Sequence, residues 1–156
     1  MGLLTPLAVK IGGLPWLPRY NAWIVRLDRL VQLLTRGRFT LLSLAGLPEL
    51  QLTVPGRKSG IERTTPLLCV PHEGGWLIAG SFWGGPKPPA WTYNLEAAGE
   101  AGVHFKGRSY RVSARRAVGD ERARLWEVMK GTWPNYAKYE ARTDREIKVY
   151  VLAPLA

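Results

Sequence analysis

The chain has 156 residues, of which 46% are hydrophobic and 22% are charged, as is typical of one globular domain with a real core. Its 22 basic and 12 acidic residues give a formal net charge of +10, so anionic partners are expected. The single cysteine, Cys69, excludes a disulfide framework, and His72 and His104 lack the spacing of metal ligands. We therefore expect a cytoplasmic protein without a metal site.

Residues 1–39 are predicted to form a basic, apolar N-terminal arm and an amphipathic helix. Four breaks, three prolines and the pair Gly12-Gly13, predict an irregular arm over residues 1–19. A helix is expected from Asn21, its cap, to a stop at Gly37. Its apolar face is formed by Trp23, Leu27, Leu30, Val31 and Leu34. This face either packs on the domain core or lets residues 1–36 lie peripherally on an anionic membrane, with arginines at the headgroups.

Residues 40–156 are predicted to form the main globular part. Alternation of apolar and polar residues, turns at Gly-rich sites and helical spacing predict short strands and helices. In chain order they are strands over Leu50–Val54, Thr64–Val70 and Trp76–Gly80, a helix over Ala90–Ala98, a hairpin turning at Lys106-Gly107, a helix from Asp120 to Gly131, a helical turn from Trp133 to about Thr143, and a strand over Ile147–Val151. Pro66 marks its strand as an edge or a bulge. About six short strands predict a mainly β fold with flanking helices, a small antiparallel barrel.

A cationic turn is the first candidate site. Pro55 ends a strand, and glycines at positions 56 and 60 provide the backbone freedom of a tight loop. Between and beside them stand Arg57, Lys58, Ser59 and Arg63. Backbone N–H groups, a hydroxyl and three cations in one loop suit an anion, most naturally a phosphate. The alternative interpretation is an ordinary exposed turn with solvated charges.

A second candidate loop follows the third strand and runs through Ser81, Phe82, Trp83, Gly84, Gly85 and Lys87 to Trp91. Its glycines allow a flat ligand to approach the backbone closely. Tyr136 and Tyr139 share one helical face, where they either close the far side of a pocket and offer phenol protons or simply pack in the core. Since no nucleophilic triad, carboxylate pair or metal cluster is evident, an enzyme of this kind would import its chemistry from a cofactor.

The residues of both loops carry a resemblance. The run Gly56-Arg57-Lys58-Ser59-Gly60, Arg63, Pro66-Leu67, Ser81, Gly84-Gly85, Lys87, Pro89, Trp91 and Asn94-Leu95, with the ending Tyr139 to Arg145 and Val151-Leu152, resembles the deazaflavin-dependent nitroreductase family of actinobacterial-type reductases. The resemblance covers about residues 49–156. These enzymes use coenzyme F420, an 8-hydroxy-5-deazaflavin with a phosphate and an oligoglutamate tail.

The resemblance implies a split β-barrel of the FMN-binding type. It implies that Arg57, Lys58 and Arg63, with Ser59, bind the phosphate and carboxylates of the coenzyme. Pro66, Leu67, Ser81 to Gly85, Lys87 and Trp91 are the other implied cofactor-binding residues, and Tyr136, Tyr139 and Ser81 the implied catalytic ones. The implied reaction is hydride transfer from C5 of the reduced deazaflavin to a quinone or nitroaromatic acceptor. Family members often act on membrane quinones, which would give the basic N-terminus a purpose.

Three alternatives stay open at this point. An FMN-binding split-barrel oxidoreductase needs fewer cations for its single phosphate. A basic nucleic-acid-binding module would stack bases on Trp83 and Trp91, although no nucleic acid is expected if the cations serve a polyanionic coenzyme. A coenzyme carrier would bind the deazaflavin without catalysis.

Overall fold

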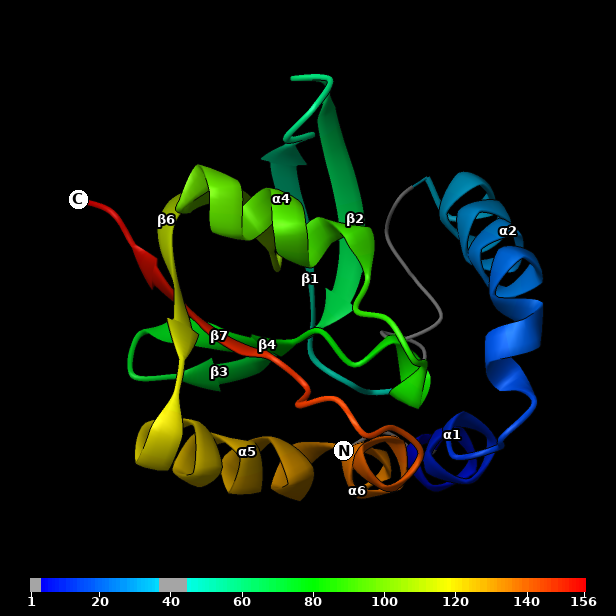
Figure 1. The fold of residues 1–156 in the computed structure, drawn as a ribbon. Helices are drawn as coiled ribbons and strands as arrows, with labels where there is room; N and C mark the ends of the chain where they lie inside the picture. The colour runs from blue at the N-terminus through cyan, green and yellow to red at the C-terminus, as the bar shows by residue number, and fades with distance from the viewer. Residues whose placement is uncertain (1–3, 37–44) are drawn as a thin grey trace. The chain divides into compact units, whose positions relative to one another are not determined.

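The structure is a computed structural model that describes residues 4–36 and 45–156, and the chain divides into two compact units, Met1–Pro48 and Glu49–Ala156 (Figure 1). The predicted boundary between residues 39 and 40 lies outside the described residues. We describe each unit by itself.

The first unit is more helical than its sequence predicts. An α-helix, α1 (Thr5–Gly12), and a 3₁₀ turn, η1 (Leu17–Tyr20), replace the irregular arm expected over residues 1–19. The prediction fails because Pro6 lies in the first turn of α1, where a missing N–H group costs nothing. The next helix, α2 (Asn21–Leu34), confirms the predicted helix, but Tyr20 rather than Asn21 is the cap residue. The expected stop at Gly37 lies outside the described residues.

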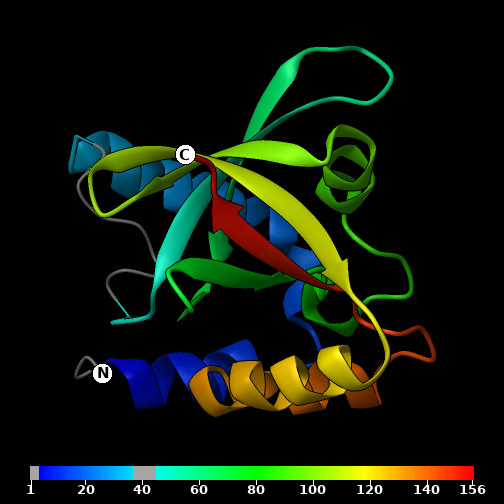
Figure 2. The same cartoon turned by 90° about the vertical axis from the view of Figure 1, so that its left-hand side faces the viewer.

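The second unit is one seven-stranded antiparallel sheet, with strand order β2-β1-β5-β6-β7-β4-β3. The bounds are β1 (Glu49–Pro55), β2 (Glu62–Leu68), β3 (Val70–His72), β4 (Gly75–Ala79), β5 (Glu100–Phe105), β6 (Arg108–Ala117) and β7 (Val149–Pro154). The helices are η2 (Phe82–Gly84), α4 (Ala90–Ala98), α5 (Gly119–Thr132) and α6 (Asn135–Ala141). The sheet curls on itself, and Figure 2 shows its strands wrapping around a common interior. This confirms the predicted small antiparallel split barrel.

Three local predictions are wrong. The strand expected over Thr64–Val70 is two strands, β2 and β3, which lie at opposite edges of the sheet with only Cys69 between them. Asp120 lies in the first turn of α5 while Val118 takes the cap position, and Gly131 is inside that helix. Ile147 precedes β7, although it is fully buried. Pro66 does stand on an edge strand, as expected, because β2 pairs only with β1.

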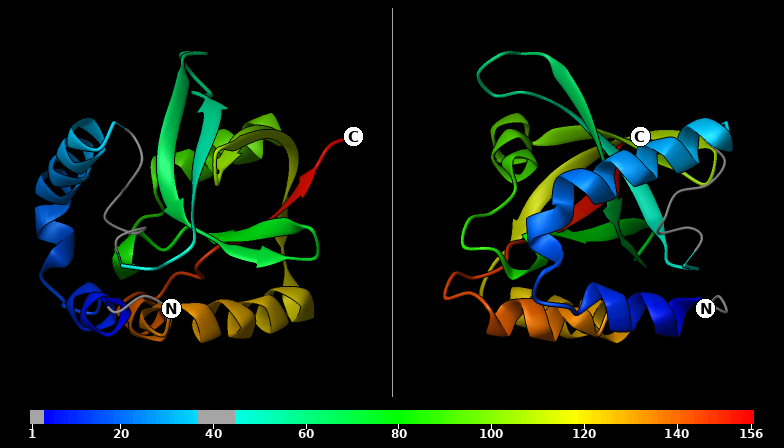
Figure 3. Two further views of the ribbon diagram at one scale, coloured as in Figure 1. Left: turned by 180° about the vertical axis from the view of Figure 1, so that it is seen from behind. Right: turned by 90° about the vertical axis from the view of Figure 1, so that its right-hand side faces the viewer.

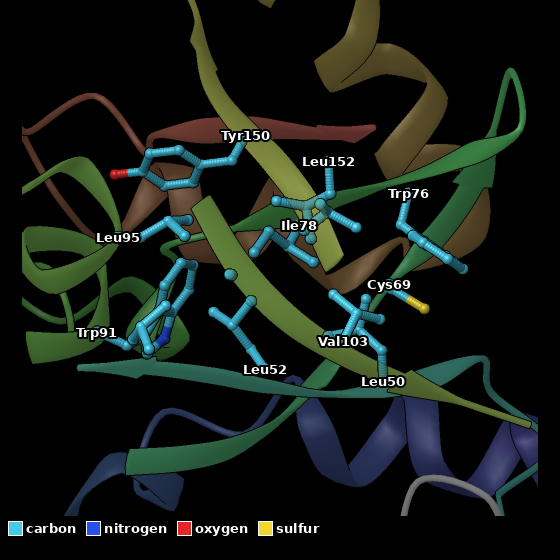
Figure 4. Packing of buried hydrophobic residues seen from close by; sticks show 13 residues of the cluster. Leu50, Leu52, Cys69, Trp76, Ile78, Trp91, Leu95, Val103, Tyr150 and Leu152 are labelled. Carbon is cyan, nitrogen blue, oxygen red and sulfur yellow. The ribbon is translucent and has the colours of Figure 1, made fainter. Parts of the chain in front are cut away.

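The core fills the interior of the curled sheet. Inward-facing residues of β1, β4, β5, β6 and β7 meet two residues of α4, Trp91 and Leu95 (Figure 4). The indole of Trp91 lies 5.7 Å from the ring of Tyr150, between centroids. Burying side chains of this size stabilises by about 2 kcal/mol each. The helix α4 is therefore fastened to the barrel by its buried face.

The second unit has two distinct ends. The β1–β2 hairpin projects beyond the rest of the sheet, while α5 and α6 lie across the opposite end, as all four ribbon views show (Figure 3). The cationic turn is at the tip of this hairpin, and the two candidate tyrosines are on α6.

Candidate functional site

The cationic turn between β1 and β2 is closed by its own backbone. The Gly56 N–H donates to the Ile61 carbonyl and the Gly60 N–H to the Gly56 carbonyl, both at 2.8 Å. The Ile61 N–H donates to the Ser59 hydroxyl at 3.2 Å. The Arg57 N–H donates to Asn94. Four amides of the turn thus have protein partners, so these four are not the N–H groups that would serve an anion.

The cationic side chains of the turn are the donors that suit a ligand. Arg57, Lys58 and Arg63 are all exposed. The Arg57 guanidinium stands 4.8 Å from the centre of the Tyr93 ring, so one of the three is held against α4. A guanidinium and an ammonium can each make charge-assisted hydrogen bonds to phosphate or carboxylate oxygens. The chemistry of this donor set fits the anionic groups of a polyanionic coenzyme.

The helix α4 joins the cationic turn to the barrel. Asn94 accepts the Arg57 N–H at 3.0 Å and is 9% exposed. Two residues later, Glu96 accepts hydrogen bonds from Lys148 at 2.9 Å and from the Tyr150 hydroxyl at 2.8 Å. Burial of the Glu96 carboxyl acts to raise its pKa, but these hydrogen bonds outweigh burial and lower the pKa. The turn is therefore coupled to β7 through α4.

The second loop, from Gly80 to Gly85, has an unusual backbone. Phe82, Trp83 and Gly84 have φ angles of 41°, 54° and 78°, so three consecutive residues are left-handed. Gly84 is required for a further reason, since a Cβ there would lie 2.5 Å from the Tyr139 carbonyl oxygen. This close approach places the loop directly against the backbone of α6.

Two arginines after α6 bind this loop, and the sequence analysis assigned them no role. Arg145 donates to the carbonyls of Gly80, Ser81 and Gly85 at 3.1, 2.9 and 3.0 Å. Arg142 donates to the Trp83 carbonyl at 3.3 Å. Burial lowers the pKa of Arg145. Their place in the run that resembles the family was the only indication of a role in the sequence. Every residue has a backbone carbonyl, so the sequence does not show which carbonyls an arginine will bind.

The predicted residues of the second loop differ in accessibility. Phe82 is exposed, as is Lys87, and Ser81 and Trp83 are half-buried. Trp91 is 7% exposed and belongs to the hydrophobic core. Its predicted contact with a cofactor ring would therefore involve at most an edge of the indole.

Pro66 and Leu67 lie on β2, opposite Gln51 and Leu50 of β1. Successive residues of a strand point to opposite faces, so these two side chains cannot line one surface together. Leu67 packs against the core, whereas Pro66 is exposed.

The candidate tyrosines of α6 are both buried, and Tyr136 packs against Trp126 of α5. Tyr136 is 4% and Tyr139 2% exposed, with ring centroids 6.1 Å apart. The Trp133 indole N–H donates to the Tyr139 hydroxyl at 3.3 Å. Burial raises the pKa of both phenols. Each is therefore a weaker acid than an ordinary tyrosine, which disfavours proton donation from either.

Other chemistry-bearing groups are structural. Burial raises the pKa of the Cys69 thiol to about 12, which makes it a poor nucleophile, as expected. Among residues 4–36 and 45–156 there is no group of three or more His, Cys, Asp or Glu side chains that could hold a metal ion. No helix in this described part is both long and apolar enough to span a bilayer.

A groove of about 310 Å³ on strands β1, β5 and β6 contains none of the predicted site residues; it is lined by Thr53, Gly102, Val103, His104, Ser109, Tyr110 and Arg111.

Comparison with known proteins adds independent information. The family model for F420H(2)-dependent quinone reductase matches residues 25–154. Rv3178 of Mycobacterium tuberculosis (strain ATCC 25618 / H37Rv), named for the same activity, is 30% identical over 107 residues, which are 69% of this chain and 90% of that protein.

Two solved structures are also similar. One is the F420-H2 dependent reductase FDR-A, with 33% identity, a TM-score of 0.64, and coverage of 68% of this chain and 94% of that one. The other is described as a domain-swapped dimer, with 29% identity, a TM-score of 0.65, and coverage of 85% and 98%.

Proposed function

The chain belongs to the F420H(2)-dependent quinone reductase family, and from this premise we propose that it reduces a quinone, with a nitroaromatic as the second candidate acceptor. Coenzyme F420 is its cofactor, and the chain is an F420-dependent oxidoreductase. The proposal concerns the acceptor and the residues that carry the reaction.

One observation supports the placement of the coenzyme best. The Pro55–Arg63 turn, with its exposed cations, and the Gly80–Gly85 loop are separate segments that α4 connects. This helix follows the loop in the chain, and its Asn94 accepts a hydrogen bond from the Arg57 N–H of the turn. An elongated ligand with a ring at one end and anions at the other matches this arrangement. In the proposal, Arg57, Lys58 and Arg63 bind the phosphate and carboxylates, and Ser81, Phe82 and Trp83 border the ring.

The remaining assignments follow from position and exposure. Gly84, Gly85 and Lys87 continue the ring side, and Trp91 presents an indole edge. Ser59 takes part in the turn, where its hydroxyl oxygen already accepts the Ile61 N–H. Pro66, the exposed member of its pair, borders the ligand from the edge strand, and Leu67 supports that strand from the core side.

The chain's own contribution to the reaction is orientation and electrostatics. When bound, the reduced deazaflavin supplies a hydride from C5. The half-buried Ser81 hydroxyl lies in the loop itself and is the side chain best placed to relay a proton to the acceptor. Tyr136 and Tyr139 are the weaker candidates because burial raises the pKa of both. Their role in the proposal is to support Gly84 through the backbone of α6.

The first experiment measures binding of oxidised F420 by fluorescence quenching, with FMN and single-stranded DNA as competitors. We expect selective binding that neither competitor displaces. The second follows anaerobic oxidation of F420H2 with a water-soluble naphthoquinone and, separately, with a nitroaromatic. Faster turnover with the naphthoquinone supports the quinone as acceptor; turnover with the nitroaromatic alone would favour the second candidate. Binding of F420 without turnover of either would contradict the catalytic proposal.

We also propose that residues 1–36 contact an anionic membrane surface, where lipid quinones reside. Apolar side chains of α2 are exposed in the described structure: Trp23 and Leu34 of its apolar face by 67% and 75%, and the neighbouring Leu33 by 76%. Arg26 and Arg29, also exposed, can meet lipid headgroups. A double variant, Leu33→Asp with Leu34→Asp, should lose sedimentation with phosphatidylglycerol vesicles while F420 affinity is unchanged. Equal sedimentation of the variant and the original chain would contradict this contact.

A further inference from the structure

The Gly80–Gly85 loop cannot owe its shape to local preference. Phe82 and Trp83 are left-handed although neither is glycine, and a residue with a Cβ is strained in this conformation. Two hydrogen bonds lie within the loop, from the Gly84 N–H to Ser81 and from the Gly85 N–H to Phe82, both at 2.9 Å. Bonds of this i to i+3 type also form in turns of the opposite hand, so they do not select this conformation. Contacts from outside the loop must therefore select it.

Arg145 supplies those contacts at both ends of the loop. Its guanidinium reaches the carbonyls of Gly80 and Ser81 where the loop begins and that of Gly85 where it ends. Three different nitrogens of one rigid, planar guanidinium make these bonds. Lysine carries its three N–H donors on a single nitrogen, so it cannot reproduce this spread pattern.

The segment that carries Arg145 is itself anchored. Two residues on, the Ile147 carbonyl accepts two hydrogen bonds from the buried Arg122, at 2.8 and 3.2 Å. The Gly80 N–H in turn donates to the Lys148 carbonyl at 2.9 Å. The backbone that carries the guanidinium is therefore held to the barrel by contacts that do not involve residues 81–85.

We propose that Arg145 is a positioning residue that holds the Gly80–Gly85 loop in its left-handed form and so determines where Phe82 and Trp83 stand against the coenzyme ring. This inference rests on the proposed function, because it requires that the ring lie against this loop. Arg142 also donates to this loop, at the Trp83 carbonyl.

The test uses full-length Arg145→Lys and Arg145→Ala, with Arg111→Lys as the matched control. Arg111 is an exposed arginine of the same unit, and its carboxylate partner, Glu100, is 3.3 Å away on the neighbouring strand. The first readout is hydrogen exchange of the coenzyme-free protein over residues 80–89. We expect exchange of the Gly84 and Gly85 amides to be at least about tenfold faster in both Arg145 variants, with β4 unchanged. Exchange equal to that of the original chain would overturn the proposal.

The second readout is F420 affinity, together with kcat and KM for the acceptor. We expect weaker coenzyme binding and a lower kcat in Arg145→Lys, which keeps the charge. In Arg145→Ala, guanidinium ion at concentrations far below those that unfold proteins should restore affinity, whereas ammonium should not. A loosened loop with unchanged F420 affinity and kcat would overturn the positioning role while leaving the reductase intact. Should the original chain itself fail to bind F420, the proposed function fails, and the exchange experiment still decides whether Arg145 holds the loop.

Discussion

The two candidate loops of the barrel are built in opposite ways. The Pro55–Arg63 turn is closed by its own backbone and presents exposed cations. The Gly80–Gly85 loop takes a costly conformation and depends on arginines about sixty residues further along the chain. The first can change its cationic side chains without changing its shape, whereas the second must change its shape if its distant partners are lost.

Because of this difference, we expect the turn to determine the affinity for the coenzyme and the second loop to determine how its ring is placed for hydride transfer. Cations on a self-supporting turn attract anionic groups wherever the side chains can reach, so their positions need not be exact to the ångström. A hydride transfer depends on the distance and angle between two rings, and a small misplacement can cost a hundredfold in rate. We expect substitutions in the turn to act on binding alone, and substitutions around the second loop to act on stability and turnover as well as on binding.

The largest expected effect is at Gly84. A Cβ there would meet the Tyr139 backbone at 2.5 and 2.9 Å, and φ is already 78°. Gly84→Ala should therefore lower the free energy of unfolding by about 3 kcal/mol, measured by urea titration. The matched control is Gly99→Ala, where φ is 69° but nothing lies within 4 Å of the new Cβ. It should cost only about 1 kcal/mol, and equal costs for the two would refute the close packing of the loop on α6.

The next effect is on coenzyme binding through the cationic turn. Lys58→Ala should weaken F420 binding about tenfold, because a charge-assisted contact contributes about 1.5–3 kcal/mol. Fluorescence titration measures the affinity, and the urea midpoint should not move, since Lys58 is exposed. The control is Lys106→Ala, in the turn of the β5–β6 hairpin, which should leave affinity unchanged. Unchanged affinity in Lys58→Ala would remove Lys58 from the site.

A smaller effect is expected where the turn meets α4. Asn94→Ala removes the acceptor of the Arg57 N–H and should cost about 1 kcal/mol of stability. It should also weaken F420 binding a few-fold, because the turn loses its link to the barrel. Asn94→Asp, which keeps an acceptor oxygen, should retain most of the affinity. If Asn94→Ala binds F420 as tightly as Asn94→Asp and the original chain do, the hydrogen bond between the turn and α4 has no role in binding.

The smallest effect is a pH dependence at Glu96, on the other end of that link. Hydrogen bonds from Lys148 and Tyr150 outweigh burial and lower its pKa, so the charged form stabilises the fold above the usual carboxyl range. That contribution is lost as the pH falls through the lowered pKa. Because the pair is partly solvated, we expect Glu96→Gln to cost at most about 0.5 kcal/mol at neutral pH and less in acid. Urea midpoints at both pH values measure it, and a larger cost in acid would contradict the assigned direction.

The sequence predicted well what depends on local pattern. Alternation located β1 and the β5–β6 hairpin, and the helix predicted over Ala90–Ala98 has the bounds of α4. It could not show that β2 and β3 are separate, because only the curl of the sheet sends them to opposite edges. It treated Trp91 as a ring-lining residue, since an indole beside glycines looks alike whether it faces a ligand or, as here, the core. The sequence did not predict a role for Arg145, because its partners are backbone carbonyls, which every residue has.

The separation of β2 from β3 has a mechanical consequence. Leu68 ends β2 and Val70 begins β3, and these strands are the two edge strands of one sheet. The single residue Cys69 therefore links the two edges covalently; we call this link the seam. The curled sheet is a band of seven strands whose two edges are joined at this point by peptide bonds. No ladder of hydrogen bonds pairs β2 with β3. A circular permutant opened at this seam would keep every strand pairing yet release the ends of the band, whereas one opened at Lys106-Gly107 would keep the band closed.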